Sequence, residues 1–574
     1  MPKKSQSLRV MPLPSHESHA KRFVRRVGQE PFEVSDDVLA EIRTGVVLGR
    51  VDRGLEWLTS RRSLLKLLNP GNRNAAGFVS YLAHCAELGD GALGTVRELV
   101  GRFQPPIRAK LALNEYAHLR LADGIVALAS GEMDSAATHF DFAISMGAQN
   151  IADQDLLMLA HFWKATSLRR MGHYESALEH AALGRAISVE LGYVSAAGVL
   201  KALEGWLNIH KEKPGRALEL LREAEVDLRQ PEDWLWSANI HAGYGRVALE
   251  EGRYELALDH LAKAESLYAA HSPLHRNMAR TLVGRACACR LIAARIAKTI
   301  DTHAAQRRKA AGRDLAATDS AARKRVEQTR GEALASLARA AQIYRGLGRP
   351  ALAASRGLGT VKIERGLLLA DCGELDGAIR EAGDAYELGS NEKDYLVMAR
   401  ARLLQSRVES AQCEEGIDED PTRHAHRAHD YAKDALNFAE QTGQPRLLAS
   451  AYISLGLILK CDFFGNADAA SECCRRAGEF LNPRNRDMLW EEYQTLSAKV
   501  LRSGTVDAKL RKWSQGVVDN KTFQQMTEEF ADLVIPSVWL REGRNISRVV
   551  TKLSISPKKV RRILLRAGLK PVHN

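Results

Sequence analysis

Small and apolar residues recur along the middle of the chain with a period close to 40 residues. The full pattern is a glycine, a second glycine after six intervening residues, an aromatic residue two positions further on, and alanines at fixed offsets, and most copies keep only part of it. The clearest copy contains Gly245, Gly252, Tyr254, Ala257 and Leu261. The alanines that mark four successive copies lie 41, 40 and 40 residues apart: Ala136, Ala177, Ala217 and Ala257. An internal repeat of this length predicts stacked helical units rather than one compact core.

The residue types at these positions predict two helices in each unit. Glycine and alanine let two helices approach closely, and the second glycine suits a helix C-cap, where positive φ costs little. A single unit cannot bury its apolar face alone, so the units must stack on one another. We therefore predict an all-α solenoid over residues 110–482, with further copies of the pattern at Ala333, Ala378, Ala428 and Ala470.

The order of residues in these units resembles the tetratricopeptide repeat. The period exceeds the 34 residues of that family, which implies longer helices. The resemblance implies an array that binds a protein, a peptide or a small effector. Trp206, Trp234 and Trp236 lie in neighbouring units, and two interpretations stay open for them: they line a partner groove, or they pack in the core.

The segments around the array have their own character. We predict a basic, disordered tail over residues 1–34, a helical cap over residues 35–109 and a helical linker over residues 483–521. Residues 297–331 are rich in Ala, Arg and Lys and nearly free of large apolar side chains. That segment cannot supply a core, so it is either a solvated extension of the repeats or a contact for nucleic acid or another partner.

Residues 522–574 predict a separate module of three helices. The first runs from about Phe523 to Arg541, and Asn545 is a suitable N-cap for the second. Ser556 is a suitable N-cap for the third, with Pro557 at its first position, where the missing N–H costs nothing. The inward face of the third helix follows helical spacing at Val560, Ile563 and Leu564.

From Asn545 to Leu569 the module resembles, without a gap, the Fis-type helix-turn-helix of bacterial transcription regulators. Val549 and Val550 replace small alanines of that family, Ser554 replaces its turn glycine, and Pro536 lies inside the first helix. The resemblance implies binding to double-stranded DNA, as a homodimer, because such modules read paired half-sites. The residues expected to bind DNA are Arg544, Asn545, Ser547, Arg548, Ser556, Pro557, Lys558, Lys559, Arg561, Arg562 and Arg566.

Positive charge is concentrated at the two ends of the chain. Residues 1–26 carry a net charge of +6 and residues 541–574 carry +9, whereas the whole chain carries +12. The residues between these ends are therefore slightly acidic overall. The body of the protein has no general affinity for polyanions, while the C-terminal end attracts them.

No motif indicates catalysis, a cofactor or a metal. The dipeptide Gly-Lys does not occur, which excludes the phosphate-binding loop of an ATPase. His424, His426 and His429 cluster, but 424 and 426 point to different sides of a helix, so we interpret all three as surface histidines. Eight cysteines without a C-x-x-C pair, and the lack of any long apolar run, favour a reduced, cytoplasmic protein without a membrane span.

These features predict a transcription regulator that is not an enzyme. The array binds a protein, peptide or small effector, and the C-terminal module binds promoter DNA. The alternative is a repeat scaffold that assembles other proteins, whose basic end docks an acidic partner without binding DNA.

Overall fold

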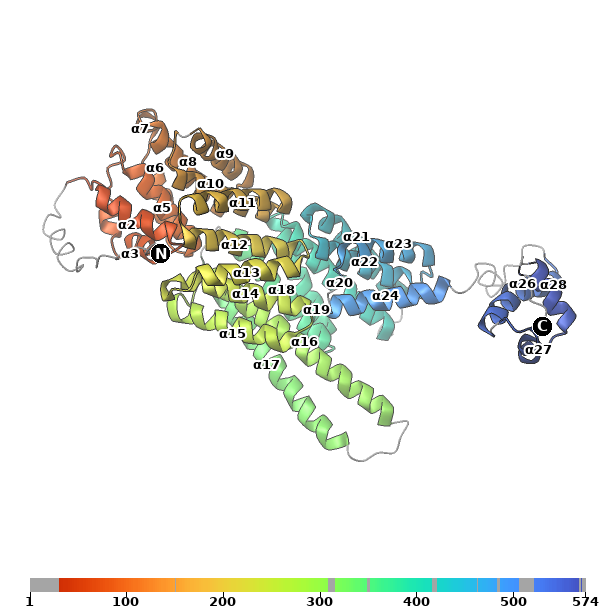
Figure 1. Ribbon diagram of the computed structural model, residues 1–574. Helices are drawn as coiled ribbons and strands as arrows, with labels where there is room; N and C mark the ends of the chain where they lie inside the picture. Colours follow the sequence, from red (N-terminus) through yellow and green to blue (C-terminus); the bar gives the residue numbers. More distant parts are fainter. Residues whose placement is uncertain are drawn as a thin grey trace, which may run out of the picture. The chain divides into compact units, whose positions relative to one another are not determined.

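The computed structural model describes residues 30–569, except for 150, 308–314, 348–351, 416–420, 462, 483–485, 505–520, 543, 567 and 568. The chain divides into two compact units, one with Met1–Ala451 and Phe480–Trp490, the other with Tyr452–Glu479 and Glu491–Asn574. Over the described ranges there is no β-strand, only an isolated bridge between Phe32 and Leu68. The predicted all-α class is therefore confirmed (Figure 1).

In the part of the chain that the structure describes, six helices precede the repeats: α2 (Asp36–Val47), α3 (Asp52–Thr59), α4 (Arg62–Leu65), α5 (Ala75–Leu88), α6 (Leu93–Gly101) and α7 (Pro105–Arg108). Phe32, Trp57 and Phe78 form their aromatic core, with ring centroids between 5.2 and 6.3 Å apart. The disordered tail was predicted to reach residue 34, but Phe32 and Val34 are buried. That boundary was wrong because the aromatic partners of Phe32 lie far downstream; the rest of the predicted tail, residues 1–29, lies outside the described residues.

Helical hairpins follow, in the order that the repeat predicted. Within the described residues they are α8 (Leu113–Ser130) with α9 (Met133–Ala148), α10 (Gln154–Met171) with α11 (Tyr174–Glu190), α12 (Val194–His210) with α13 (Pro214–Asp227), α14 (Trp234–Glu250) with α15 (Tyr254–His271), α16 (Arg276–Arg307) with α17 (Leu315–Gly346), α18 (Leu352–Asp371) with α19 (Leu375–Asn391), α20 (Tyr395–Glu415) with α21 (Pro421–Thr442), and α22 (Pro445–Leu459) with α23 (Ala467–Phe480). A short 3₁₀ helix, Pro231–Asp233, precedes α14.

The repeated small residues lie where the two helices of a hairpin meet. Ala136, Ala177, Ala217 and Ala257, the alanines that set the period, have no exposed surface. A Cβ added at Gly245 of α14 would come within 2.8 Å of Leu261 on α15, which is closer than such contacts allow. The small residues are therefore required by the close approach of the helices, as the sequence predicted.

The first unit brings together residues that are far apart in the chain. Gly172, in the turn between α10 and α11, lies against the carbonyl oxygen of Thr442, and Gly252, in the turn between α14 and α15, lies against that of Arg486. Both glycines have positive φ, +86° and +71°. Helical turns early in the array are thus covered by the end of the same unit, and a side chain at either turn would collide with backbone.

The helices α16 and α17 contain the segment 297–331, for which the sequence left two interpretations. Residues 297–307 continue α16 and residues 315–331 belong to α17, whereas 308–314 lie outside the described residues. Ile300 and Val326 are buried and pack with Ala293 between the two helices, so the expectation that this segment supplies no core was wrong at these two positions. The two helices extend beyond their neighbours as an arm (Figure 1), so the described part of the segment is a helical extension. That this segment contacts nucleic acid or a partner stays a prediction.

The predicted linker at 483–521 contains a packed helix, α24 (Met488–Gly504). Leu496 of α24 is fully buried and fits against Gly456 of α22, where an added Cβ would lie 2.8 Å from it. Residues 488–504 therefore belong to the folded end of the array rather than to a linker. Residues 505–520 of the predicted linker lie outside the described residues.

Candidate functional site

The C-terminal module consists of α26 (Phe523–Arg541), α27 (Ile546–Leu553) and α28 (Pro557–Arg566), close to the predicted bounds. The apolar faces of the three helices enclose one small core. Its buried members are Ala531, Ile535, Trp539, Val549, Val560, Ile563 and Leu564. This core fixes α28 against the other two helices and leaves the opposite side of α28 at the surface.

The two short helices begin with the predicted caps. The Asn545 side chain accepts a hydrogen bond from the Arg548 N–H at 3.1 Å, and the Ser556 Oγ accepts one from the Lys559 N–H at 3.3 Å. Ser554, which stands where the Fis-type family has glycine, adopts the left-handed region with φ +51°, so the serine is strained as glycine would not be. Pro536 does not divide α26, which runs through it.

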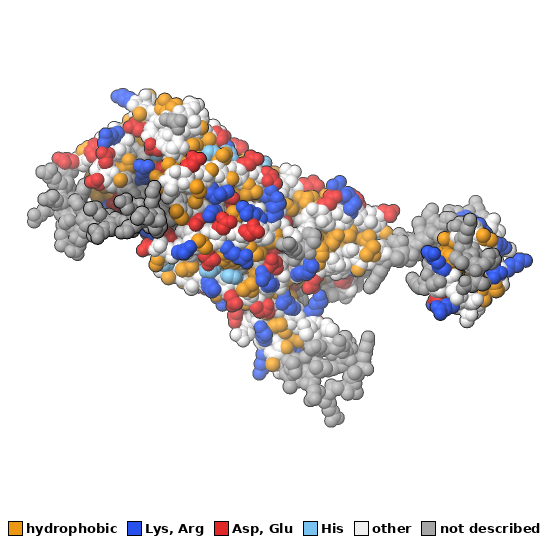
Figure 2. Space-filling view, in the orientation of Figure 1, with side chains coloured by type: hydrophobic (Ala, Val, Ile, Leu, Met, Phe, Trp, Pro, Cys, Tyr) orange, Lys and Arg blue, Asp and Glu red, His pale blue; other side chains and the backbone are white. Residues whose placement is uncertain are grey.

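The residues predicted to bind DNA lie at the start of α27, in the turn before α28 and along α28. All are exposed apart from the half-buried Lys559: Arg544, Asn545, Ser547, Arg548, Ser556, Pro557, Lys558, Lys559, Arg561, Arg562 and Arg566. Lys and Arg side chains stand out on the surface of this module in Figure 2. The structure brings the predicted residues onto neighbouring segments of one small module.

Two of the predicted cations are already paired inside the module. Arg562 Nη2 donates to Glu528 Oε1 at 2.8 Å, and Arg566 donates to Glu528 at 3.3 Å and to Asp532 at 3.2 Å. The hydrogen bond from Arg566, followed by the charges of Arg562 and Arg566, lowers the pKa of Glu528. Glu528 and Asp532 were not among the residues predicted to matter, although their spacing of four residues places both on one face of the first helix.

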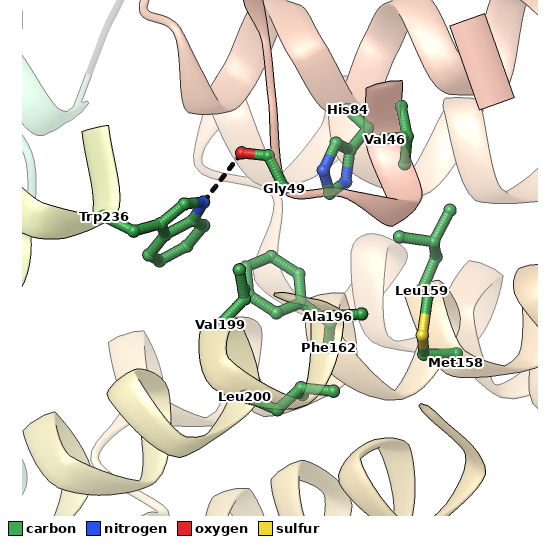
Figure 3. Close-up of a pocket in the computed structure, with 10 residues that line it drawn as sticks. All are labelled: Val46, Gly49, His84, Met158, Leu159, Phe162, Ala196, Val199, Leu200 and Trp236. Atoms are coloured by element: carbon green, nitrogen blue, oxygen red, sulfur yellow. Dashed lines mark hydrogen bonds between the residues drawn. The ribbon is translucent and has the colours of Figure 1, made fainter. Parts of the chain in front are cut away.

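The three tryptophans of the predicted groove do not share one environment. Trp234 is buried, with its ring stacked on His271 at 4.9 Å, and Trp236 is buried as well, while Trp206 is half-buried. Trp236 Nε1 donates to the carbonyl oxygen of Gly49 at 2.9 Å, as Figure 3 shows. Trp234 and Trp236 are therefore packed in the interior rather than open to a partner.

The N-terminal helices occupy the space in front of Trp236. The end of α2 and residues of α5, α10, α12 and α14 enclose a cavity of about 20 Å³, which has room for about one water molecule. His84 of α5 lines this cavity (Figure 3) and accepts a hydrogen bond from Trp163 Nε1 at 3.1 Å. This part of the array's interior is thus filled by the same chain.

His424 corrects one prediction about the histidine cluster. Its ring is buried and lies 2.6 Å from Glu409, measured between Nδ1 and Oε2, so it is not a surface histidine. The partner lies on α20, across the hairpin, where a local pattern could not reveal it.

Among the described residues, no helix combines the length and hydropathy that crossing a membrane requires.

Comparison with known proteins concerns the fold alone. No protein-family model matches the chain, and no curated protein matches it. Yeast Tom70 is 12% identical with a TM-score of 0.38, over 82% of this chain and 99% of that one. The quorum sensor NprR from B. thuringiensis, in its apo form, is 9% identical with a TM-score of 0.35, over 76% and 99%. A human IFIT1 dimer with m7Gppp-AAAA is 13% identical with a TM-score of 0.34, over 78% and 96%. The helical hairpins and their period make this chain a tetratricopeptide-like α-solenoid.

Proposed function

We propose that this protein is a cytoplasmic, non-enzymatic regulator that binds duplex DNA through α27 and α28. The observation that carries the proposal is the module itself, in which a capped α28 is held on a buried core with its cationic side outward. A helix of this kind fits the major groove, where Lys and Arg neutralise phosphates and contact base edges. Binding as a homodimer belongs to the same proposal.

The array supplies the regulatory part of the proposal, binding a protein, a peptide or a small effector. Stacked hairpins of this kind form extended curved surfaces suited to such ligands. Because the N-terminal helices fill the region around Trp236, we place the ligand elsewhere in the array.

Fluorescence anisotropy with a labelled duplex tests the DNA-binding part. Lys558 and Arg561 are exposed and form no ion pair with any described residue. If each contacts a phosphate, alanine at either position lowers the slope of log affinity against log salt by about 0.9. Lys110→Ala removes an equally exposed cation from the first unit and leaves the slope unchanged. Absence of binding at low salt refutes the proposal.

The second candidate is a scaffold that binds proteins and no DNA. It is favoured by Glu528 and Asp532, which place negative charge beside α28 and neutralise Arg562 and Arg566. The scaffold is supported if the full chain forms a stable protein complex without nucleic acid and Lys558→Ala or Arg561→Ala abolishes that complex. The DNA-binding regulator is supported if these variants weaken only the binding of duplex DNA.

A further inference from the structure

Four arginines meet inside the first unit. Arg169 and Arg170 stand at the end of α10, and Arg276 and Arg280 stand in the first turns of α16. Glu87, at the end of α5, bridges two of them: its Oε1 accepts from Arg170 Nη2 at 2.7 Å and from Arg276 Nη1 at 3.0 Å. Helices that are distant in the sequence thus bring their positive charges to one place.

The remaining two arginines have no carboxylate of their own. Neither Arg169 nor Arg280 forms a side-chain hydrogen bond or an ion pair with any residue that the structure describes, and Nε of Arg169 is buried without a partner. The second carboxylate of the cluster, Asp90, accepts from the backbone N–H of Arg276 and lies 3.8 Å from its guanidinium. The two carboxylates are thus engaged by Arg170 and Arg276, which leaves the positive charges of Arg169 and Arg280 without a carboxylate.

The electrostatics of neighbouring groups agree with this surplus. Desolvation, followed by the charges of Arg280, Arg170 and Arg276, lowers the pKa of Arg169 to about 9. Desolvation, with the charge of Arg169 next, lowers the pKa of His210 to about 3. Burial is the main cause of both shifts, and the neighbouring guanidinium charges lower both pKa values further, as expected where positive charge is not fully compensated.

The cluster is open to solvent on one side. Arg280 is exposed, and the side chain of Arg246, on the neighbouring α14, is 45% exposed. Solvent, and a ligand dissolved in it, can therefore reach the cluster at these two arginines. His210 stacks on Tyr174 with ring centroids 5.3 Å apart at the edge of this cluster.

We propose that Arg169 and Arg280 bind the phosphoryl group of a small molecule inside the array. A phosphoryl group carries close to two negative charges at neutral pH and several acceptor oxygens, which matches the two uncompensated guanidinium groups. A single carboxylate would leave one of the two charges unbalanced. The inference rests on the part of the proposed function that gives the array a ligand and is independent of DNA binding.

Calorimetric titration of the full chain without DNA tests this site. The probes are inorganic phosphate, pyrophosphate and glucose 6-phosphate, with a phosphoserine peptide as the other source of the group and acetate as the carboxylate, all at one ionic strength. We expect phosphate compounds to bind, acetate to bind at least about tenfold more weakly, and Arg169→Gln or Arg280→Gln to weaken phosphate binding by about tenfold or more. Arg380→Gln, which removes an exposed arginine from α19, leaves the affinity unchanged.

Thermal unfolding separates loss of the site from loss of the fold. Because Arg169 is a desolvated cation without a partner, Arg169→Gln raises the Tm of the unliganded protein and removes the further rise that phosphate gives the wild type. The proposal is overturned if the wild type binds no phosphate compound, if acetate binds equally well, or if both glutamine variants keep the phosphate response. Tight binding of the phosphopeptide alone refutes the small-molecule source. Duplex binding, measured separately on the same samples, shows whether the DNA-binding proposal stands or fails by itself.

Discussion

Replacing Glu528 with glutamine should strengthen DNA binding. In the structure this carboxylate on α26 accepts hydrogen bonds from Arg562 and Arg566 of α28, so it cancels positive charge on the helix that we propose to enter the groove. Glutamine keeps the shape of the side chain and removes its charge, which frees about one cation for phosphate. One additional neutralised phosphate adds about 0.9 to the slope of log affinity against log salt, or about eightfold tighter binding at about 0.1 M salt.

Glu529→Gln is the matched control for this change. Glu529 is the next residue of α26, and its carboxylate lies 2.9 Å from Lys521 Nζ, so the variant changes the net charge of the chain equally without touching the pair on α28. Anisotropy titrations with one duplex at several salt concentrations measure both affinity and slope. Surface ion pairs contribute little to stability, so both variants should remain folded by circular dichroism. Equal affinities for the two variants would refute the reasoning.

Three further predictions concern the fold. Ser554→Gly should relieve the strain of a left-handed residue and stabilise the C-terminal module by about 1 kcal/mol. This gain should slow amide hydrogen exchange in α27 about fivefold, and an unchanged exchange rate would contradict the prediction. Gly172→Ala should lower the Tm much more than Gly373→Ala. Both glycines have positive φ, but only Gly172 lies against backbone, so its alanine adds about 1–3 kcal/mol of overpacking to the strain that both variants share. Equal losses of Tm would show that the contact is unimportant. Burial lowers the pKa of His84 to about 3 in the folded protein, because the folded state accepts the neutral ring and disfavours the protonated one. The contribution of His84 to the stability of the fold is therefore complete above about pH 6.5, the pKa in the unfolded chain, and is lost as the pH falls toward 3. The Tm should therefore fall less steeply with acidification in His84→Gln than in the wild type, and parallel curves would refute this.

The array could be predicted from the sequence because its determinants are local and repeated. An alanine such as Ala177 must be small wherever two helices of one hairpin touch, and it recurs with the hairpin. The caps Asn545 and Ser556 were predictable for the same reason, because a cap bonds to residues three positions away. Their hydrogen bonds agree with the positions at which α27 and α28 were predicted to begin.

What could not be predicted depends on partners far away in the chain. The hydrogen bond from Trp236 to Gly49 joins residues that are 187 positions apart in the chain, and no periodicity in the sequence indicates it. The surplus charge of Arg169 becomes visible only when α5, α10 and α16 meet. Ser554 was identified as standing in place of a turn glycine, but its left-handed backbone could not be predicted from serine itself, because the hydrogen bonds and packing of α27 and α28 override the preference of that residue.

The contacts of Gly172 with Thr442 and of Gly252 with Arg486 set a limit on how this protein can change over evolution. Repeat proteins commonly gain or lose units, since each unit contacts only its neighbours. In this protein, two turns of the array also contact residues more than 200 positions away in the chain, Thr442 and Arg486. A hairpin inserted between the partners of such a contact would move the turn away from the segment that covers it. Duplication, the usual way in which such arrays grow, is therefore unfavourable between these contacts, and new length is accommodated more easily where the chain already extends outward, along α16 and α17.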